Sequence, residues 1–246
     1  MDMTKEAIEK IVSLVQPELR EIEGRTFALH ANGETEELRP TMDFPTALDL
    51  TSLDAMVQMI RTEAIVRYAA PLYIAIPTPS RVECFAQPDA ALRQLRMSYY
   101  VASATDVPGW GEKVTMPFEE AMIALRTRFQ DTPDTLYALK LLSEISTGAK
   151  ITYNDNGVAT TVVTKRGIDL QANEQIRPIV KLKPYRTFQE VEQPESEFLI
   201  RISERGITFV EADGGMWRLT ARKTIKSYFE TALADMVDDG RVVVML

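Results

Sequence analysis

Cysteine and histidine are nearly missing from this sequence, which contains one of each, Cys84 and His30, among 246 residues. A single cysteine cannot form an internal disulfide, so we expect a reduced, intracellular setting. No histidine or basic helix start adjoins Cys84, which favours a buried, inert thiol. Histidine-based metal sites are excluded, and Ser-His-Asp or Cys-His catalysis would have to depend on His30 alone.

Long apolar runs and phosphate-binding glycine loops are missing as well. No run approaches the ~20 apolar residues of a membrane helix, and the charged N-terminus leads into an amphipathic pattern rather than a signal sequence. Neither GxxxxGK[ST] nor GxGxxG after a strand occurs. The net charge of −8 argues against broad, non-specific binding to phosphate backbones. We therefore expect no membrane partner, no cofactor, no metal and no enzymatic activity.

The first part of the chain combines helical periodicity with short strands. Helices are predicted over residues 4–15, 51–64, 88–99, 118–129 and 132–147, with Thr51 and Thr132 as N-caps. A strand pair is predicted across residues 20–29, and two strands over residues 72–76 and 81–86. The polar segments 30–45 and 103–116 are predicted as loops or extended arms.

After Gly148 the pattern becomes mostly β. A hairpin is predicted from residues 150–153 and 158–165, followed by strands over residues 176–183, 197–203 and 207–211. The glycines at 214–215 are predicted to turn between two strands, with Trp217 at a strand start. A helix over residues 222–237 and a strand over residues 241–246 close the chain.

This order favours an α+β fold, because helices and strands do not alternate regularly. We expect a helix-rich N-terminal half and a mostly antiparallel β C-terminal part with a closing helix. The corresponding regions are residues 1–148, mixed helical and β, and residues 149–246, β-rich with the C-terminal helix. We expect them to form one integrated fold.

Two blocks of opposite charge abut in the second part. Residues 177–186 contain four basic side chains and no acid, whereas residues 189–197 contain four acids and no base. The blocks could pair within the chain, which is worth little at a surface, or the basic block of one copy could meet the acidic block of the next. A third interpretation is a nucleic-acid contact in which Tyr185 stacks on a base. The candidate binding or interface residues are Arg177, Lys181, Lys183, Tyr185, Arg186, Glu190, Glu192, Glu195, Glu197 and Trp217.

Other interpretations of these side chains are weaker. The four glutamates could gather around a divalent cation, but alternation along an extended segment favours a solvated edge. Trp110 and Trp217 could anchor a partner or close a core, and a core position is favoured for Trp217.

Three strings resemble the signatures of an uncharacterised protein family of tailed bacteriophages and prophages. They cover residues 183–188 (KPYRTF), 191–198 (VEQPESEF) and 211–217 (EADGGMW). A looser likeness extends to residues 225–228 and 48–85. The resemblance implies a product found in the host cytoplasm of an infected or lysogenic bacterium, and it assigns no catalytic residues.

Two hypotheses follow for the function. The first is a non-enzymatic phage accessory protein that forms a homo-oligomer, such as a ring or closed shell, by means of the charge blocks and the two polar arms. The alternative is a nucleotide- or nucleic-acid-binding accessory protein that sequesters a host signalling nucleotide or assists recombination. Its anion contacts would come from the basic residues of 177–186.

Overall fold

The computed structural model describes residues 4–5, 10, 17–23, 25–30, 32–38, 47–67, 71–88, 96–147, 151–155, 160–166, 169–170, 174–175, 177–203 and 206–246. The chain forms two compact units, Met1–Pro45 and Thr46–Leu246. Most of the helix predicted over residues 4–15 lies outside the described residues.

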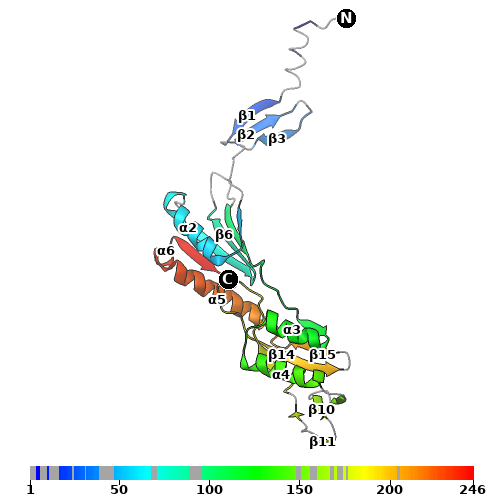
Figure 1. Ribbon diagram of the computed structural model, residues 1–246. Coiled ribbons are helices and arrows are strands. Elements are labelled where there is room, and N and C mark those ends of the chain that lie inside the picture. Colours follow the sequence, from blue (N-terminus) through cyan, green and yellow to red (C-terminus); the bar gives the residue numbers. More distant parts are fainter. Residues whose placement is uncertain are drawn as a thin grey trace. The chain divides into compact units, whose positions relative to one another are not determined.

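The first unit contains a small antiparallel sheet with the strand order β1-β2-β3, which we call the N-terminal sheet (Figure 1). Its strands are β1 (Glu18–Ile22), β2 (Arg25–Leu29) and β3 (Thr35–Leu38). The pairing of β1 with β2 confirms the strand pair predicted across residues 20–29. The prediction of a loop or arm over residues 30–45 is wrong for β3, because Leu38 pairs with Thr26 and Thr35 pairs with Leu29.

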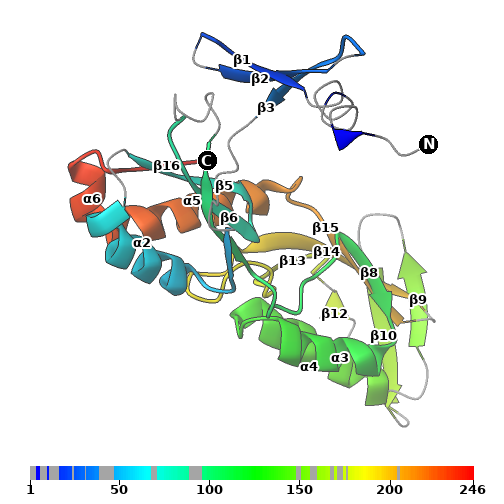
Figure 2. The same cartoon turned by 90° about the horizontal axis from the view of Figure 1, so that it is seen from above.

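The second unit builds one hydrophobic core on a five-stranded sheet with the order β16-β5-β6-β7-β4. The strands are β4 (Leu48–Leu50), β5 (Leu72–Thr78), β6 (Arg81–Ala86), β7 (Ser98–Ser103) and β16 (Val242–Met245), and the helices are α2 (Leu53–Arg67), α5 (Met216–Ala232) and α6 (Ala234–Asp238). Strand alternation places Leu72, Ile74 and Cys84 on the face that packs against α2 and α5 (Figure 2). We call the buried side chains of these elements, with Phe188 and Val191, the first core.

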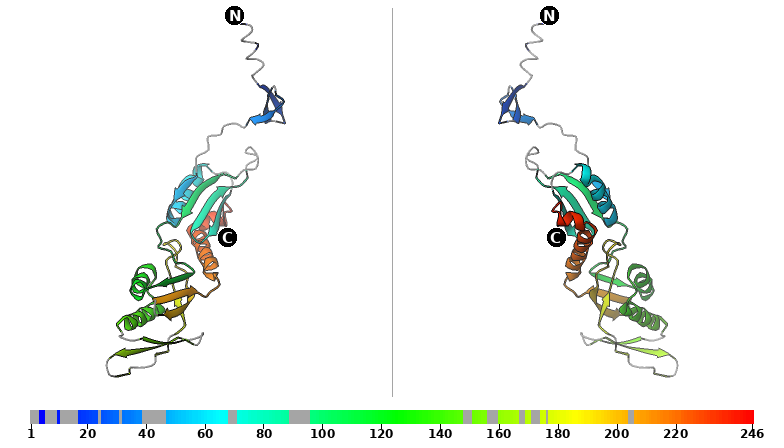
Figure 3. Two further views of the ribbon diagram at one scale, coloured as in Figure 1. Left: turned by 90° about the vertical axis from the view of Figure 1, so that its right-hand side faces the viewer. Right: turned by 90° about the vertical axis from the view of Figure 1, so that its left-hand side faces the viewer.

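A second core forms on an antiparallel sheet with the order β13-β14-β15-β8. Its elements are β8 (Lys113–Met116), α3 (Phe118–Arg128), α4 (Pro133–Thr147), β13 (Ile179–Leu182), β14 (Ser196–Ser203) and β15 (Gly206–Glu211). Helices α3 and α4 pack on the sheet face that carries Phe198, Ile200 and Phe209 (Figure 3). The amide of Thr135 donates to Thr132 Oγ1 at 3.1 Å, which confirms Thr132 as the N-cap of α4.

A separate small sheet contains β10 (Thr160–Arg166), which pairs with β9 (Ile151–Asp155), β11 (Asp169–Leu170) and β12 (Glu174–Gln175). The antiparallel pairing of β9 and β10 confirms the two strands of the predicted hairpin. The turn between them lies outside the described residues.

The α+β class is confirmed, but the helix-rich N-terminal half is wrong. Strands come first: β1 to β4 precede α2 in the described part of the chain. The helix predicted over residues 88–99 gives way to strand β7 from Ser98, and residues 89–95 lie outside the described residues. The predicted loop at 103–116 ends in strand β8, because Val114 pairs with Phe209 of β15.

Both cores draw on segments from each side of residue 148. The first core combines α2 and β5 with α5 and β16, and the second combines α3 and α4 with β13 to β15. Periodicity along the chain identifies each element but not its partner, so a boundary at residue 148 does not separate the cores.

Candidate functional site

The strings that carry the family resemblance meet in a buried polar cluster of the second unit. Arg186 is only 6% exposed and forms a salt bridge with Glu211, at 2.5 Å between the guanidinium and carboxylate. Its guanidinium also donates to Ser196 Oγ and lies 3.8 Å from the centre of the Trp217 ring. We call these four residues and Asp213 the Arg186 network.

The electrostatics of this cluster favour a structural role. Burial lowers the pKa of the Arg186 guanidinium, while the hydrogen bond and charge of Glu211 oppose that shift. The guanidinium nevertheless stays charged, because arginine is effectively always protonated in proteins. A buried charge pair is costly to break on one side, because the remaining charge is left without compensation. The network therefore holds β14, β15 and the preceding loop in one arrangement.

Asp213 connects the Arg186 network to the start of α5. Its carboxylate accepts hydrogen bonds from Ser196 Oγ at 2.7 Å and from the amides of Gly215 at 2.9 Å and Trp217 at 3.3 Å. Such side-chain acceptors satisfy the free amides at a helix start. Gly215 has a φ of +77°, and an added Cβ there would lie 2.5 Å from the Arg218 guanidinium.

This geometry corrects two predictions. The glycine turn joins strand β15 to helix α5, rather than joining two strands, and α5 begins at Met216 instead of residue 222. Trp217 therefore lies in the first turn of a helix. The sequence contained the signal, since Trp217, Ala221, Ile225 and Phe229 repeat every four residues.

A buried glutamine fixes the loop between β13 and β14. Gln193 Oε1 accepts from the amides of Arg186 at 3.0 Å and Thr187 at 3.2 Å, and its Nε2 donates to the Phe188 carbonyl at 2.9 Å. The loop leaves the second core and inserts Phe188 and Val191 into the first. The string at residues 183–198 therefore ties the two cores together.

The opposed charge blocks pair within the chain. Lys183 Nζ lies 2.5 Å from Glu192, and Lys181 lies 3.9 Å from Glu195 and 4.0 Å from Glu197. The hydrogen bond and charge of Lys183 lower the pKa of Glu192. Exposed pairs of this kind contribute about 0–1 kcal/mol each. Their geometry favours the intrachain interpretation over contacts between copies.

Arg177 and Tyr185 also make contacts within the second unit. Arg177 lies 3.0 Å from Asp134 on α4, and its guanidinium stacks 3.9 Å from the centre of the Tyr137 ring. The Tyr185 amide donates to the Arg128 carbonyl at 2.9 Å, so the backbone here bridges to the end of α3. Tyr185 itself is half-buried.

Glu190 has a role that its sequence neighbours did not suggest. Its carboxylate accepts the Leu53 amide at 2.7 Å, which satisfies a free donor at the N-terminus of α2. Ser52 Oγ accepts the Ala55 amide at 3.1 Å, so Ser52 replaces Thr51 as the capping side chain. Glu190 lies in a turn rather than along a solvated strand edge.

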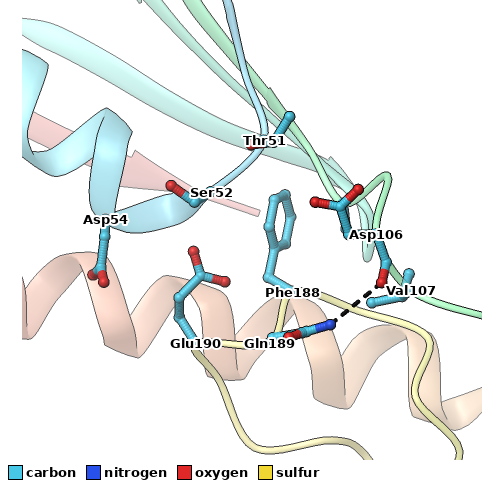
Figure 4. A pocket seen from close by; sticks show the side chains of 9 residues that line it. Thr51, Ser52, Asp54, Asp106, Val107, Phe188, Gln189 and Glu190 are labelled. Atoms are coloured by element: carbon cyan, nitrogen blue, oxygen red, sulfur yellow. Dashed lines mark hydrogen bonds between the residues drawn. The ribbon is translucent and has the colours of Figure 1, made fainter.

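A surface pocket of about 390 Å³ adjoins this cap (Figure 4). Asp54, Asp106 and Glu190 are among the residues that line it. The carboxylates of Asp106 and Glu190 lie on either side of the Phe188 ring, whereas that of Asp54 points toward α5 (Figure 4). Tyr228 donates to Asp54, and burial, followed by the Asp54 carboxylate, raises the pKa of its phenol. Three acids around one opening repel phosphate groups.

No group of three or more His, Cys, Asp or Glu within the described ranges is arranged to hold a metal ion.

The single cysteine, the single histidine and Trp110 take no part in the Arg186 network. Cys84 is fully buried in the first core, which confirms its predicted burial, and desolvation raises the pKa of the thiol to about 12. His30 lies 3.5 Å from Glu36 in the first unit. Trp110 packs edge-on against Phe129 and Phe209 at the second core, with ring centres 4.7 Å and 5.8 Å apart.

No family model, curated protein or solved structure matches the chain. The likeness to the phage family therefore depends on the three strings and on the looser likeness at residues 225–228 and 48–85. Of the helices that the structure describes, none is both long and apolar enough to cross a membrane.

Proposed function

We propose that this chain is a non-enzymatic phage accessory protein that works as a homo-oligomer. One observation carries the proposal: among the described residues of the first unit, Ala28 is the only buried apolar side chain. A sheet of three strands needs a covered hydrophobic face to be stable in water. Another copy of the chain would supply that cover.

The exposed side chains of the N-terminal sheet support this conclusion. Leu19, Ile22 and Leu38 are 61%, 53% and 38% exposed. The register of the strands places Leu19 and Leu38 on one face and Ile22 on the other. All of β1 is exposed, and it is an edge strand of the sheet. An exposed edge and apolar side chains on both faces favour association.

The five-stranded sheet of the second unit offers a further surface for association. Among the described elements, helices cover the first-core face, whereas the opposite face carries the stacked rings of Tyr73 and Phe85, 5.8 Å apart. Arg96 lies 5.3 Å from the Tyr73 ring, and Val243 on the same face is 38% exposed. Aromatic side chains and arginine are enriched at protein interfaces.

The nucleotide or nucleic-acid alternative has less support. Each of the four cations between Arg177 and Arg186 has a carboxylate partner within the chain, and the pocket beside Glu190 is acidic. The resemblance alone supports a phage setting and the host cytoplasm. The non-enzymatic part of the proposal depends on the scarcity of catalytic side chains in the sequence.

Light scattering coupled to size exclusion tests the proposal. We expect the full chain to elute at a multiple of its 27.7 kDa mass. Replacing Leu19, Ile22 and Leu38 with Asp should reduce that mass, because buried charges oppose association. The control Leu136→Asp changes an exposed leucine of α4 and should leave the mass unchanged. A wild-type mass of 27.7 kDa at every concentration would overturn the proposal.

A further inference from the structure

Helix α5 carries a basic surface with an apolar end. Residues 216–226 contain four cations and no acid, and α5 buries only the stripe of Ala221, Ile225 and Phe229. Met216 and Leu219 are 58% and 37% exposed at its start. Helical spacing places both on one face with the exposed side chains of Thr220 and Lys223. We call Met216, Leu219, Thr220 and Lys223 the α5 face.

Further cations surround the α5 face. Arg218 lies 2.7 Å from Glu112, Arg222 Nε donates to the Ile76 carbonyl at 2.7 Å, and Lys226 lies 3.6 Å from Glu230. Lys223 forms no ion pair with any residue that the structure describes. Lys223 is therefore the exposed cation of the α5 face that is left without a carboxylate partner in the described part of a chain whose net charge is −8.

The N-terminal sheet has a face of matching chemistry. The register places Leu19, Ala28 and Glu36 in one row, and Glu21, Thr26 and Leu38 in the next row on the same face. This face contains two exposed leucines and two glutamates, while Arg20 and Arg25 lie on the opposite face. We call it the acidic leucine face. Residues 1–45 as a whole hold ten carboxylates against five basic side chains.

We propose that the acidic leucine face of one copy docks on the α5 face of another copy. Leu19 and Leu38 would cover Met216 and Leu219, while the glutamates meet Lys223 and its neighbours. The inference rests on the proposed homo-oligomer and names its contact. Such a contact joins two different surfaces, so repetition gives a ring where the rotation closes and an open filament where it does not, whereas reciprocal exchange closes a dimer.

A protein occupant fits this surface better than a nucleic acid. Nucleic-acid surfaces combine unpaired cations with aromatic side chains on which bases stack. The α5 face instead places methionine and leucine beside one lysine, Lys223, that has no carboxylate partner among the described residues, and Arg218 and Lys226 already have acidic neighbours. An apolar centre with a charged rim is typical of a protein interface.

Crosslinking between two differently tagged copies tests the contact. One copy carries Leu19→Cys and the other Met216→Cys, and a bismaleimide reagent joins them after mixing. Cys84 gives no background, because it is buried and its pKa is raised to about 12. The control pair combines Leu19→Cys with Leu136→Cys, which replaces an exposed leucine on α4. We expect about tenfold more mixed product with Met216→Cys, because docking raises the local concentration of the thiols.

The possible results separate this inference from the proposed function. An oligomer that gives no more mixed product with Met216→Cys than with Leu136→Cys overturns the inference but leaves the homo-oligomer in place. A monomer at every concentration overturns both. A chain that carries both Leu19→Cys and Met216→Cys separates crosslinks within one chain from crosslinks between copies. If it links only within single chains and mixed copies never link, the contact between copies is wrong.

Charge reversal gives an independent measurement. Lys223→Glu with Lys226→Glu should weaken association, and so should Glu21→Lys with Glu36→Lys, while mixing the two reversed proteins should restore mixed assembly. Lys140→Glu on α4, whose side chain is 71% exposed, is the matched control and should change nothing. Failure of the two reversed proteins to restore assembly would contradict the charge pairing.

Discussion

The N-terminal sheet and the second unit differ in how much apolar surface they bury. The second unit encloses two cores on two sheets, with fully buried side chains such as Phe229 and Phe209. The N-terminal sheet, in its described part, buries only Ala28. Since apolar burial is the main favourable term in folding, the second unit contains its own source of stability. Under the proposed function, another copy of the chain covers the N-terminal sheet.

The charged residues of the second unit show the same contrast on a smaller scale. Arg186 and Glu211 are buried together beside Ser196 and Trp217, whereas Lys183 and Glu192 pair at the surface. Only the buried pair is expected to matter greatly for stability, because its members cannot be rehydrated in the folded state.

The largest effect is expected in the first core. Phe229→Ala should lower the free energy of unfolding by about 3–5 kcal/mol, because it leaves a cavity between α5 and the sheet. Ile22→Ala in the N-terminal sheet should change it by less than about 0.5 kcal/mol. Urea unfolding at one fixed, low protein concentration measures both. Equal losses would remove the contrast between the two regions.

The next effect concerns the buried charge pair. Glu211→Gln should cost about 3 kcal/mol, because Arg186 would keep a buried charge without its counterion. The double change Arg186→Met/Glu211→Leu should recover much of that loss, since an apolar pair requires no compensation. A double variant that is less stable than Glu211→Gln would contradict this account of the Arg186 network.

A smaller loss is expected at the start of α5. Asp213→Ala removes the acceptor for the amides of Gly215 and Trp217 and should cost about 1 kcal/mol. Asp213→Asn keeps an acceptor oxygen and should lose less. Thermal unfolding of the two variants compares them, and identical transitions would argue against the cap.

The smallest effect is expected for the surface pair. Lys183→Ala should change the unfolding free energy by less than about 0.5 kcal/mol, because Glu192 is largely exposed. Lys183 lowers the pKa of Glu192 in the folded chain. The pair therefore stabilises the fold fully above the pKa of a glutamate in the unfolded chain, about 4.3. This small stabilisation is lost as the pH falls from that value through the lower pKa of Glu192 in the folded chain. Urea unfolding of Lys183→Ala should therefore show a larger loss of unfolding free energy at pH 7 than at pH 3. A larger loss at pH 3 would contradict this account.

Local patterns predicted much of the secondary structure. Helix α4 begins at Pro133 behind the Thr132 cap, and β5, β6 and β16 lie where short apolar runs predicted strands. Such patterns depend on neighbouring residues, which the sequence displays directly. Local patterns gave a wrong prediction where a turn can lead into either a strand or a helix. At Gly214–Gly215 a strand was predicted, but helix α5 begins directly after the turn.

Long-range partners could not be predicted. Nothing near Arg186 indicates that its carboxylate comes from Glu211, or that Phe188 enters the first core. The parallel pairing of β16 with β5 likewise joins Val242 to Leu72 across most of the chain. These pairings follow from the packing of the whole unit, and periodicity along the sequence carries no information about them.

Hydrogen exchange followed by mass spectrometry at two protein concentrations tests the central claim most directly. If another copy completes the N-terminal sheet, the amides of β1 to β3 should exchange more slowly at high concentration. Those of β5 and β14 should not change, because the second unit encloses its own cores. Exchange of β1 to β3 at the same rate across the whole concentration range would contradict the account.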